Sequence, residues 1–408
     1  MNRLIVLVAV AVVLASCSRT GKDDSALLKH ALELHAKMVS IDTHTDTPLN
    51  FLRAGFDFSG DNNNAIMSKV DLKRMEAGKL DAAFFAVFIG QRECTPQKYA
   101  EVNRQALDIF KAIDDVISKY PARAAIAKNP DDAYRIKAEG KRAIYIGVEN
   151  GYPIGEDLSQ LKLFYDLGAR YVTLCHTRNN QICDSSTDPD GYIHNGLSDF
   201  GKQVVATMNE LGMLIDVSHI SDKSFYDVLE LSKAPVFASH SCARAICNNP
   251  RNLDDSMLQA IAKKGGVVQM CILSDYVKEM PRNPERDSAF RALRVKYNNF
   301  RDLTPEQDEQ ATAEWYELEH KYPRELATVS DAVNHIDHMV KVMGINHVGI
   351  GTDFDGGGGI SGCEDVSQMY NITVELLRRG YSDSDIKKIW GENFLRVFRA
   401  AQSCARKK

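Results

Sequence analysis

The sequence predicts an α/β protein that forms a single (β/α)8 barrel of the TIM type, with a helical insert before the eighth strand. Apolar, strand-forming runs alternate with longer segments of helical spacing, which is the pattern of a parallel sheet covered by helices. Eight such runs occur, as a closed barrel requires. The length of 408 residues fits one barrel with an insertion, because such barrels commonly exceed about 250 residues.

The predicted strands are continuous apolar runs, as expected for strands that are buried on both faces. A doubly wound open sheet is the alternative that the same alternation of strands and helices allows. Residues 157–168 and 221–233 illustrate the segments between the runs, since each begins with a capping residue and has apolar positions three or four apart. The eight runs are Met38–Asp46, Leu80–Ile89, Arg142–Asn150, Ala169–Thr177, Gly212–Ile220, Ala234–Ser241, Gly265–Leu273 and His347–Asp355.

The longest interruption covers residues 274–327, between the seventh and eighth strands. This segment is far longer than an ordinary loop, and it is charged with helical stretches. We favour a solvated helical excursion over a substrate lid or a dimer contact. The amphipathic segment SDSDIKKIWGENFLRVFRAAQ, residues 382–402, predicts helices that pack on the barrel exterior.

The N-terminus predicts a separate targeting segment. One arginine precedes an apolar run from Leu4 to Leu14, which is too short for a comfortable membrane span. The residues LASC that end at Cys17 resemble the lipobox of bacterial lipoproteins, in which the signal is cut before the cysteine and the cysteine is lipidated. We expect a signal peptide with a lipidated Cys17 over residues 1–17, a polar tether over 18–30 and the barrel domain over 31–408. The chain would then be a lipid-anchored lipoprotein of a bacterial cell envelope, facing the periplasm or at the outer-membrane surface.

Composition excludes some classes of function. The net charge is only −5 and no basic run stands out, which argues against nucleic acid as a partner. The cysteines other than Cys17 form no CxxC pair, so a zinc ribbon or a thioredoxin-like site is not expected, and their disulfide pairing cannot be assigned from the sequence. The glycine-rich stretch of residues 353–359 lacks the Lys-Ser/Thr of a phosphate loop.

Polar residues end most of the predicted strands, where the catalytic groups of such barrels gather. A single strand-end histidine is more often a hydrogen-bonded structural residue than a ligand. Several imidazoles and carboxylates at one barrel mouth are costly to bury unpaired, whereas a divalent metal satisfies them. The other seven of the eleven histidines are interpreted as structural. The strand-end residues are His44, Asp46, Glu149, His176, His219, His240, Asp353 and Asp355.

The types of these ligands favour zinc, because imidazole and carboxylate suit that ion and no thiolate is needed. Three imidazoles and two carboxylates would already make five protein ligands. That number exceeds what one catalytic zinc takes while it keeps a position open. Two ions fit better, since a carboxylate can bridge ions about 3.5–4 Å apart in the general two-metal hydrolase arrangement.

Seven motifs of the chain resemble those of the membrane dipeptidase (renal dipeptidase) family of binuclear zinc peptidases, whose fold is a barrel of the metal-dependent hydrolase kind. The resemblance covers nearly the whole chain after the targeting segment, in the order of the family. The motifs are IDTHTDTP (41–48), GVENG (147–151), YVTLCHT (171–177), IDVSHIS (215–221), PVFASHS (235–241), NPRNLDD (249–255) and VGIGTDFDG (348–356).

The resemblance implies a zinc site on these residues. By position, His44 and Asp46 bind one zinc ion, His219 and His240 bind the other, and Glu149 bridges the two. A hydroxide that bridges the ions would attack the peptide carbonyl of a dipeptide.

The remaining roles also follow from the resemblance. His176 is the substrate-binding histidine and could stabilise the developing oxyanion. Arg251 would bind the free C-terminal carboxylate of the dipeptide, and Asp353 would transfer the proton. The family also tends to form homodimers.

Two other functions compete with a zinc dipeptidase. One is a related amidohydrolase that acts on cyclic amides or lactams, where a modified lysine usually bridges the metals. The third strand supplies Glu149 instead, which disfavours this alternative. The other is a noncatalytic lipoprotein that binds a solute or a metal, which would not need Arg251 and Asp353 beside a complete ligand set. The preferred dipeptides, the tolerance of D-residues or lactams and the oligomeric state do not follow from the sequence.

Overall fold

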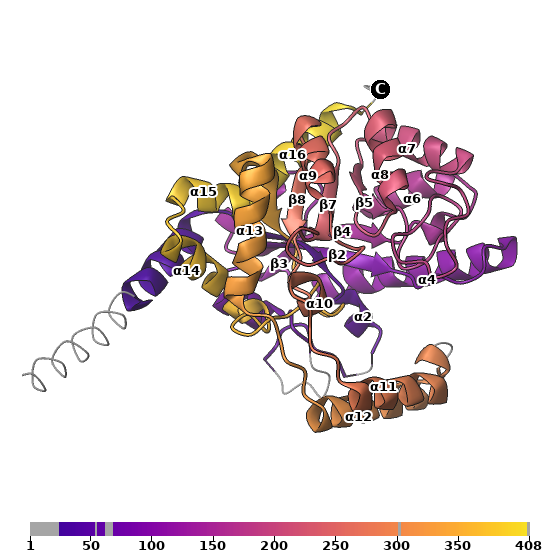
Figure 1. Ribbon diagram of the computed structural model, residues 1–408, viewed down its shortest axis with the longest axis horizontal. Coiled ribbons are helices and arrows are strands. Elements are labelled where there is room, and N and C mark those ends of the chain that lie inside the picture. The colour runs from indigo at the N-terminus through magenta and orange to yellow at the C-terminus, as the bar shows by residue number, and fades with distance from the viewer. Residues whose placement is uncertain (1–23, 54, 62–67, 301–302, 406–408) are drawn as a thin grey trace, which may run out of the picture.

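The computed structural model describes residues 24–53, 55–61, 68–300 and 303–405 (Figure 1). Its centre is the predicted barrel of parallel strands, in the order β1-β2-β4-β5-β6-β7-β8-β9. All pairs along this path are parallel. The strands of the path are β1 (Ile41–Thr45), β2 (Ala82–Phe88), β4 (Arg142–Glu149), β5 (Ala169–Thr173), β6 (Leu214–Asp216), β7 (Phe237–Ser241), β8 (Val267–Met270) and β9 (Val348–Ile350).

The sheet closes between its first and last strands. Thr45 forms a parallel bridge with Phe354, just beyond β9. The Asp46 amide donates to the Phe354 carbonyl at 2.8 Å, and the Asp353 amide donates to the His44 carbonyl at 3.0 Å. These contacts exclude the doubly wound open sheet and bring the ends of β1 and β9 together.

Each predicted strand run contains one strand of the barrel, but several runs extend beyond the strand. The runs predicted to end at Ile220 and Asp355 contain β6 and β9, which are only three residues long. The backbone turns away soon after each strand, with φ of 72° at His219 and 61° at Asp353. These segments are apolar because they are buried as loops. One strand was not predicted: β3 (Ala124–Ile126) pairs with the first residues of β4, outside the barrel path.

Helices surround the barrel (Figure 1). Two of them match the predicted segments: α6 is capped at its C-terminus by Gly168, which takes the left-handed conformation with φ of 116°, and α8 begins after the capping side chain of Ser221. The helices are α2 (Pro48–Phe51), α3 (Leu72–Ala77), α4 (Pro96–Ile117), α5 (Asp132–Ala138), α6 (Ser159–Leu167), α7 (Asp199–Leu211), α8 (Asp222–Leu231), α9 (Asp255–Lys263), α10 (Ser274–Val277), α11 (Pro284–Lys296), α12 (Pro305–Lys321), α13 (Val329–Met343), α14 (Tyr370–Arg378), α15 (Asp383–Lys387) and α16 (Asn393–Ser403).

The last helix departs from its predicted place on the barrel exterior. Phe394 of α16 contacts Phe84 of β2 and Phe237 of β7, with ring centroids 5.3 and 5.5 Å apart. These rings belong to a core cluster that also contains the first residues of several strands. The apolar face of α16 therefore closes the N-terminal end of the barrel, opposite to the ends where the predicted ligands lie.

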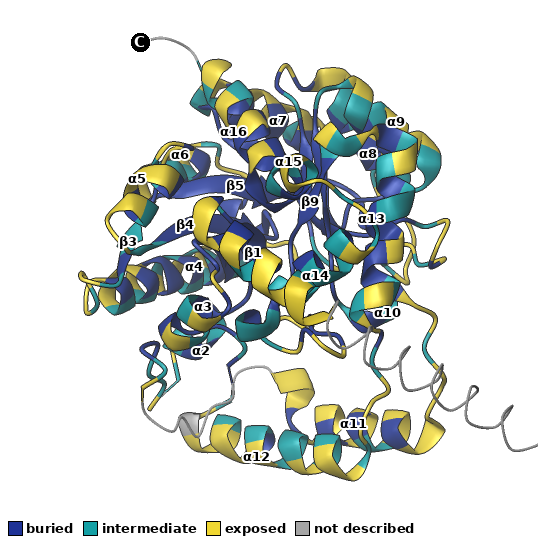
Figure 2. Cartoon of the chain, turned by 90° about the vertical axis from the view of Figure 1, so that its left-hand side faces the viewer, coloured by how far each residue is buried: buried dark blue, intermediate teal, exposed yellow. Residues whose placement is uncertain are grey.

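The long insert folds as two helices that pack on each other, α11 and α12. Leu293, Tyr297 and Ala311 form a small core between them, separate from the barrel core. The two helices stand apart from the barrel in Figure 2, and an ion pair of 3.6 Å between Arg53 Nε and Asp308 Oδ2 links α12 to the segment after α2.

Residues 1–23, which include the predicted signal peptide and Cys17, lie outside the described residues. The described part of the predicted tether, residues 24–30, is not irregular but begins a helix of residues 24–37. Burial of Ala31 and Leu34 on one face of this helix explains the difference. Within the described residues, no helix is both long and apolar enough to cross a membrane. The eight described cysteines are all free thiols.

Candidate active site and metal centre

The eight predicted site residues all come from the C-terminal ends of the barrel strands. Strands supply three of them, and the segments that follow strands supply the other five. The structure therefore brings together residues that are far apart in the sequence. His44 and Asp353, which are 309 positions apart, lie in the same cluster of possible metal ligands. From the strands come His44, Glu149 and His240, and from the segments after them come Asp46 (one residue past β1), His176, His219, Arg251 and Asp353.

Glu149 lies at the centre of the site, and its two oxygens face different partners. Oε2 is 3.5 Å from His44 Nε2. Oε1 is 3.1 Å from His219 Nε2 and 3.5 Å from His240 Nε2. One carboxylate thus joins two groups of possible ligands, of which the first also contains Asp46. This is the arrangement that a bridging ligand needs.

The ligand nitrogens converge more closely than ordinary packing requires. His219 Nε2 and His240 Nε2 are 2.9 Å apart, and His44 Nε2 is 3.6 Å from Asp46 Oδ2. A tetrahedral zinc with bonds of about 2.0–2.1 Å would hold two ligand nitrogens roughly 3.3 Å apart. The spacing of both groups therefore fits a small divalent ion.

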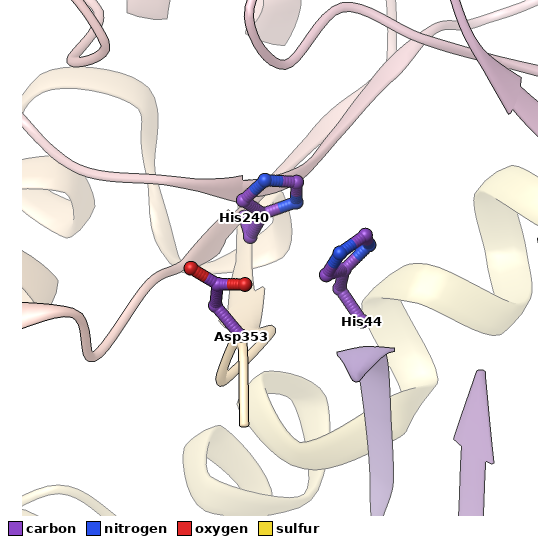
Figure 3. Close-up of side chains that lie close together, drawn as sticks. All are labelled: His44, His240 and Asp353. Atoms are coloured by element: carbon purple, nitrogen blue, oxygen red, sulfur yellow. The ribbon is translucent and has the colours of Figure 1, made fainter. Parts of the chain in front are cut away.

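Asp353 reaches the same cluster from the segment after β9, beside the end of β1. Figure 3 shows its carboxylate near the imidazole rings of His44 and His240, and ligand atoms of the three residues lie within 4.8 Å of one another. The neighbouring Asp355 does not join them. Its carboxylate accepts hydrogen bonds from Thr47 Oγ1, at 2.8 Å, and from other loop groups, which gives it a structural role.

Several buried polar atoms of the site have no hydrogen-bond partner among the described residues. They are His44 Nε2, Asp46 Oδ1, His219 Nδ1 and Arg251 Nε. Buried polar groups are normally satisfied, so unmet capacity of this kind needs an explanation. A divalent ion supplies one for the imidazole and carboxylate atoms that face the centre, and the donor set of nitrogen and oxygen atoms fits zinc.

The electrostatics of the cluster lead to the same conclusion. Burial lowers the pKa of His219 and His240 well below the usual value, and the charge of Arg251 adds to this effect. Burial and the neighbouring Asp46 raise the pKa of Asp353 well above its usual value. These shifts favour the neutral, metal-binding form of His219 and His240, whereas the pKa of His44, beside the Tyr171 phenol and the Glu149 carboxylate, is raised well above its usual value despite burial. A divalent cation would replace the proton of His44 and offset the charge of the carboxylates.

The backbone at the site takes conformations that most residues avoid. Asn150, which follows Glu149, has φ of 72°, and His219 and Asp353 are also left-handed. Such positions cost roughly 1–3 kcal/mol each and cluster at functional sites. Gly356 is needed for another reason, because a Cβ atom there would lie 2.0 Å from Asp46 Oδ2.

Arg251 is a buried cation beside the metal cluster. Its side chain is packed against the Tyr276 ring, and its Nη2 donates to the His240 carbonyl at 3.1 Å. No ion pair with an acidic side chain is found for it among the described residues, although the residue is only 3% exposed. A guanidinium in this state is ready to receive a carboxylate from outside the chain.

His176 lies at the edge of the cluster, with its side chain 22% exposed. Its Nε2 is 3.9 Å from Glu149 Oε1, and its ring packs between those of Phe88 and His219. Burial, with a further contribution from the charge of Arg251, lowers the pKa of His176 to about 3. The imidazole is therefore neutral at neutral pH and can donate one hydrogen bond to a substrate oxygen.

Sequence reasoning missed the residues that support the ligands from below. His44 Nδ1 lies 2.8 Å from the Tyr171 hydroxyl. His240 Nδ1 lies 2.7 Å from Ser239 Oγ, which donates to Asp216 Oδ2 at 2.6 Å. A signal was present, because a charged residue such as Asp216 within a buried apolar strand requires partners.

Comparison of the chain with known proteins identifies its family. Residues 28–408 match the model of the membrane dipeptidase family (peptidase family M19). The chain belongs to that family. It is 31% identical to dipeptidase tcpJ of Claviceps purpurea over 89% of this chain and 77% of that protein. It is 32% identical to dipeptidase C965.12 of Schizosaccharomyces pombe over 91% of this chain and 82% of that protein.

Solved structures agree with this assignment. The probable dipeptidase PvdM from Pseudomonas aeruginosa is 34% identical and superposes with a TM-score of 0.79, over 93% of this chain and 100% of that chain. A metallopeptidase of the same family, dipeptidase AC, shares the fold at 23% identity with a TM-score of 0.72, over 90% of this chain and 99% of that chain. The protein is thus a metal-dependent dipeptidase, a hydrolase of peptide bonds.

Proposed function

We propose that this dipeptidase works with two zinc ions, one held by His44 and Asp46 and the other by His219 and His240, with Glu149 as the bridge. The observation that carries the proposal is the split of the Glu149 carboxylate, whose Oε2 is 3.5 Å from His44 Nε2 while Oε1 is 3.1 Å from His219 Nε2. None of the ligand groups found among the described residues contains a cysteine, which also favours zinc over softer ions.

When bound, zinc ions supply Lewis acidity and make water nucleophilic at neutral pH. The residues of the chain do the remaining work. Arg251 binds the C-terminal carboxylate of the dipeptide through its planar fork of donors, which fixes the peptide bond beside the metal cluster. This requirement for a free carboxylate next to the scissile bond restricts the C-terminal side of the substrate to one residue, as a dipeptide has.

Two further residues act on the reacting atoms. His176, neutral at neutral pH, donates its N–H to the carbonyl oxygen as negative charge develops there. Asp353 takes a proton from the attacking water and delivers it to the leaving amine. Burial raises the pKa of Asp353, which lets the carboxylate hold the proton between the two steps.

We also propose that the mature chain is attached to a membrane of a bacterial cell envelope by lipid on Cys17. The apolar run before the LASC motif supports this location. The test is mass spectrometry of the protein purified from membranes, where a lipid-modified N-terminal Cys17 is expected. A Cys17→Ala variant that partitions into membranes as the wild type does would contradict the proposal.

The metal proposal is tested on protein that lacks residues 1–17. Elemental analysis should find about two zinc ions per chain. A chelator should remove them together with cleavage of alanyl-alanine, and added zinc should restore both. Full activity after verified removal of metal would overturn the proposal.

The role of Arg251 is tested with two substrates, alanyl-alanine and its C-terminal amide. Arg251→Ala should lower kcat/KM for the free dipeptide by about 10²-fold or more, because truncating one partner of a buried charge pair costs about 2–5 kcal/mol. The slow cleavage of the amide should change little. The matched control is Arg170→Ala, a buried arginine at the start of β5 that donates only to backbone carbonyls. An equal loss on both substrates would contradict carboxylate binding.

A further inference from the structure

The phenol of Tyr171 lies directly behind one of the two ligand groups. Tyr171 is buried in β5, and its hydroxyl is 2.8 Å from Nδ1 of His44. The other ring nitrogen of His44, Nε2, faces Asp46 and Glu149 and has no hydrogen-bond partner among the described residues. The histidine is therefore held from behind by one group, while its free nitrogen is presented to the centre.

We propose that Tyr171 is a positioning residue for the ion that His44 and Asp46 hold, and that its hydroxyl sets the affinity of this ion without touching the substrate. The inference rests on the two-ion centre proposed above. In the metal-bound protein, Nδ1–H donates to the phenolic oxygen, which leaves the Nε2 lone pair for the ion and fixes the plane of the ring.

Gly147 leaves the space that the Tyr171 ring occupies. A Cβ atom on Gly147, in the neighbouring strand β4, would lie 2.0 Å from Tyr171 Cζ. Any other residue at position 147 would displace the phenol from His44. Phe84 and Phe237 pack against the Tyr171 ring, with centroids 5.3 and 5.4 Å away, and hold it upright in the barrel. Gly147 in the GVENG motif thus serves the metal centre through Tyr171.

A phenol has a property here that a carboxylate lacks, because it both donates and accepts a hydrogen bond. In the absence of metal, the Tyr171 hydroxyl can donate to Nδ1, and Nε2–H then points to the carboxylates of Asp46 and Glu149. Loading of metal at Nε2 requires that the imidazole change tautomer, with loss of the Nε2 proton and uptake of a proton at Nδ1, and that the Tyr171 hydroxyl turn to accept from Nδ1–H. Nδ1 of His44 therefore keeps the Tyr171 hydroxyl as its partner with and without metal, so it is never buried without a hydrogen bond.

The second ligand group is supported differently. His240 Nδ1 contacts Ser239 Oγ, which donates to the carboxylate of Asp216. That carboxylate also accepts Thr173 Oγ1 at 2.5 Å and is buried. The two ligand groups are thus held by separate residues. A neutral phenol contacts His44, whereas His240 is held through Ser239 by the Asp216 carboxylate. Loss of the Tyr171 hydroxyl should therefore affect one ion only.

The test is zinc binding by Tyr171→Phe, measured by competition with a chromophoric chelator on protein that lacks residues 1–17. The substitution keeps the ring and removes one oxygen. One zinc should bind as in the wild type, and the other should bind roughly 10- to 100-fold more weakly, as for other groups that support a ligand from behind. The zinc concentration for half-maximal activity should rise by the same factor, while KM at saturating zinc stays unchanged.

The matched control is Tyr145→Phe. Tyr145 is buried in the same aromatic layer and stacks on Phe84 at 4.8 Å, but its hydroxyl donates to the Asn129 carbonyl at 2.9 Å, away from the ligands. It should bind both ions as the wild type does, and thermal melting shows whether the two variants lose similar stability. Wild-type affinity for both ions in Tyr171→Phe, or equal weakening of both, would overturn the inference while the two-ion centre stands. A wild type that binds no zinc would overturn the centre itself.

Discussion

The two ends of the barrel both bury charged side chains, but they treat them differently. At the N-terminal end, Asp81 precedes β2 and is 3% exposed. Its carboxylate accepts the Ser40 amide at 3.0 Å, Lys137 Nζ at 2.7 Å and Arg142 Nη1 at 3.3 Å. Arg142 Nε lacks a partner among the described residues, yet the carboxylate at the centre of this network is fully used.

At the C-terminal end, the polar atoms that face the centre are left open. His44 Nε2, Asp46 Oδ1 and Arg251 Nε have no hydrogen-bond partner among the described residues. The comparison teaches that burial of charge does not mark a site by itself. What distinguishes the C-terminal end is a set of buried donor and acceptor atoms that no described group of the chain satisfies. We therefore expect an Asp→Asn substitution to have different consequences at the two ends.

The largest effect is expected for Asp353→Asn at the C-terminal end. The amide keeps the shape of the side chain but cannot carry a proton from water to the leaving amine. The kcat for dipeptide cleavage should fall by ~10²–10⁴-fold. Zinc content, measured by elemental analysis of the same sample, should stay at the wild-type level. Loss of zinc together with activity would make Asp353 a ligand, and unchanged turnover would remove it from the mechanism.

Much of this site could be predicted from the sequence, because the barrel confines function to the ends of strands. Once β1 and β4 were identified, His44 and Glu149 had to lie at one rim. Arg251 was different, since it lies in a loop whose path no periodicity predicts. Asp353 was placed at the rim as the end of the eighth run, but only the resemblance of their motifs to the dipeptidase family gave these two residues their roles.

The supporting contacts could not be predicted in this way. The pairing of Tyr171 with His44 depends on the register of strands that are not neighbours in the barrel, and on the space left by Gly147. The place of α16 was wrong for a related reason. An amphipathic pattern shows that one face is buried, but it does not say whether that face covers the wall of the barrel or closes its end.

The second prediction makes the same substitution at the N-terminal end. Asp81→Asn should lower the free energy of unfolding by about 2 kcal/mol, because Lys137 and Arg142 lose their anionic partner in a partly buried network. The kcat and the zinc content should not change. Urea unfolding followed by circular dichroism measures the first quantity, and steady-state kinetics the second. A loss of kcat comparable to that of Asp353→Asn would erase the distinction between the two ends.

The smallest effect concerns His35, a histidine interpreted as structural from the sequence. It lies in the helix of residues 24–37, is 1% exposed, and its Nε2 is 2.7 Å from Thr373 Oγ1. Burial, helped by the charge of Lys137, lowers the pKa of His35 to about 4. In the unfolded chain the imidazole is protonated below its ordinary pKa of about 6.5, whereas in the folded chain it is protonated only below about pH 4. Stability is therefore lost as the pH falls through this window.

The His35→Gln variant isolates that loss, because its amide nitrogen can still donate to Thr373 but does not titrate. Between pH 7.5 and 5.5 the wild type should lose about 1 kcal/mol of unfolding free energy more than the variant does. Ligand histidines of the C-terminal end titrate in both proteins, so their contribution cancels in the difference. Parallel pH profiles of unfolding for the two proteins would contradict a buried, neutral His35. A difference that appears only below pH 6.5 would show that the folded chain responds to acid through His35, independently of the metal centre.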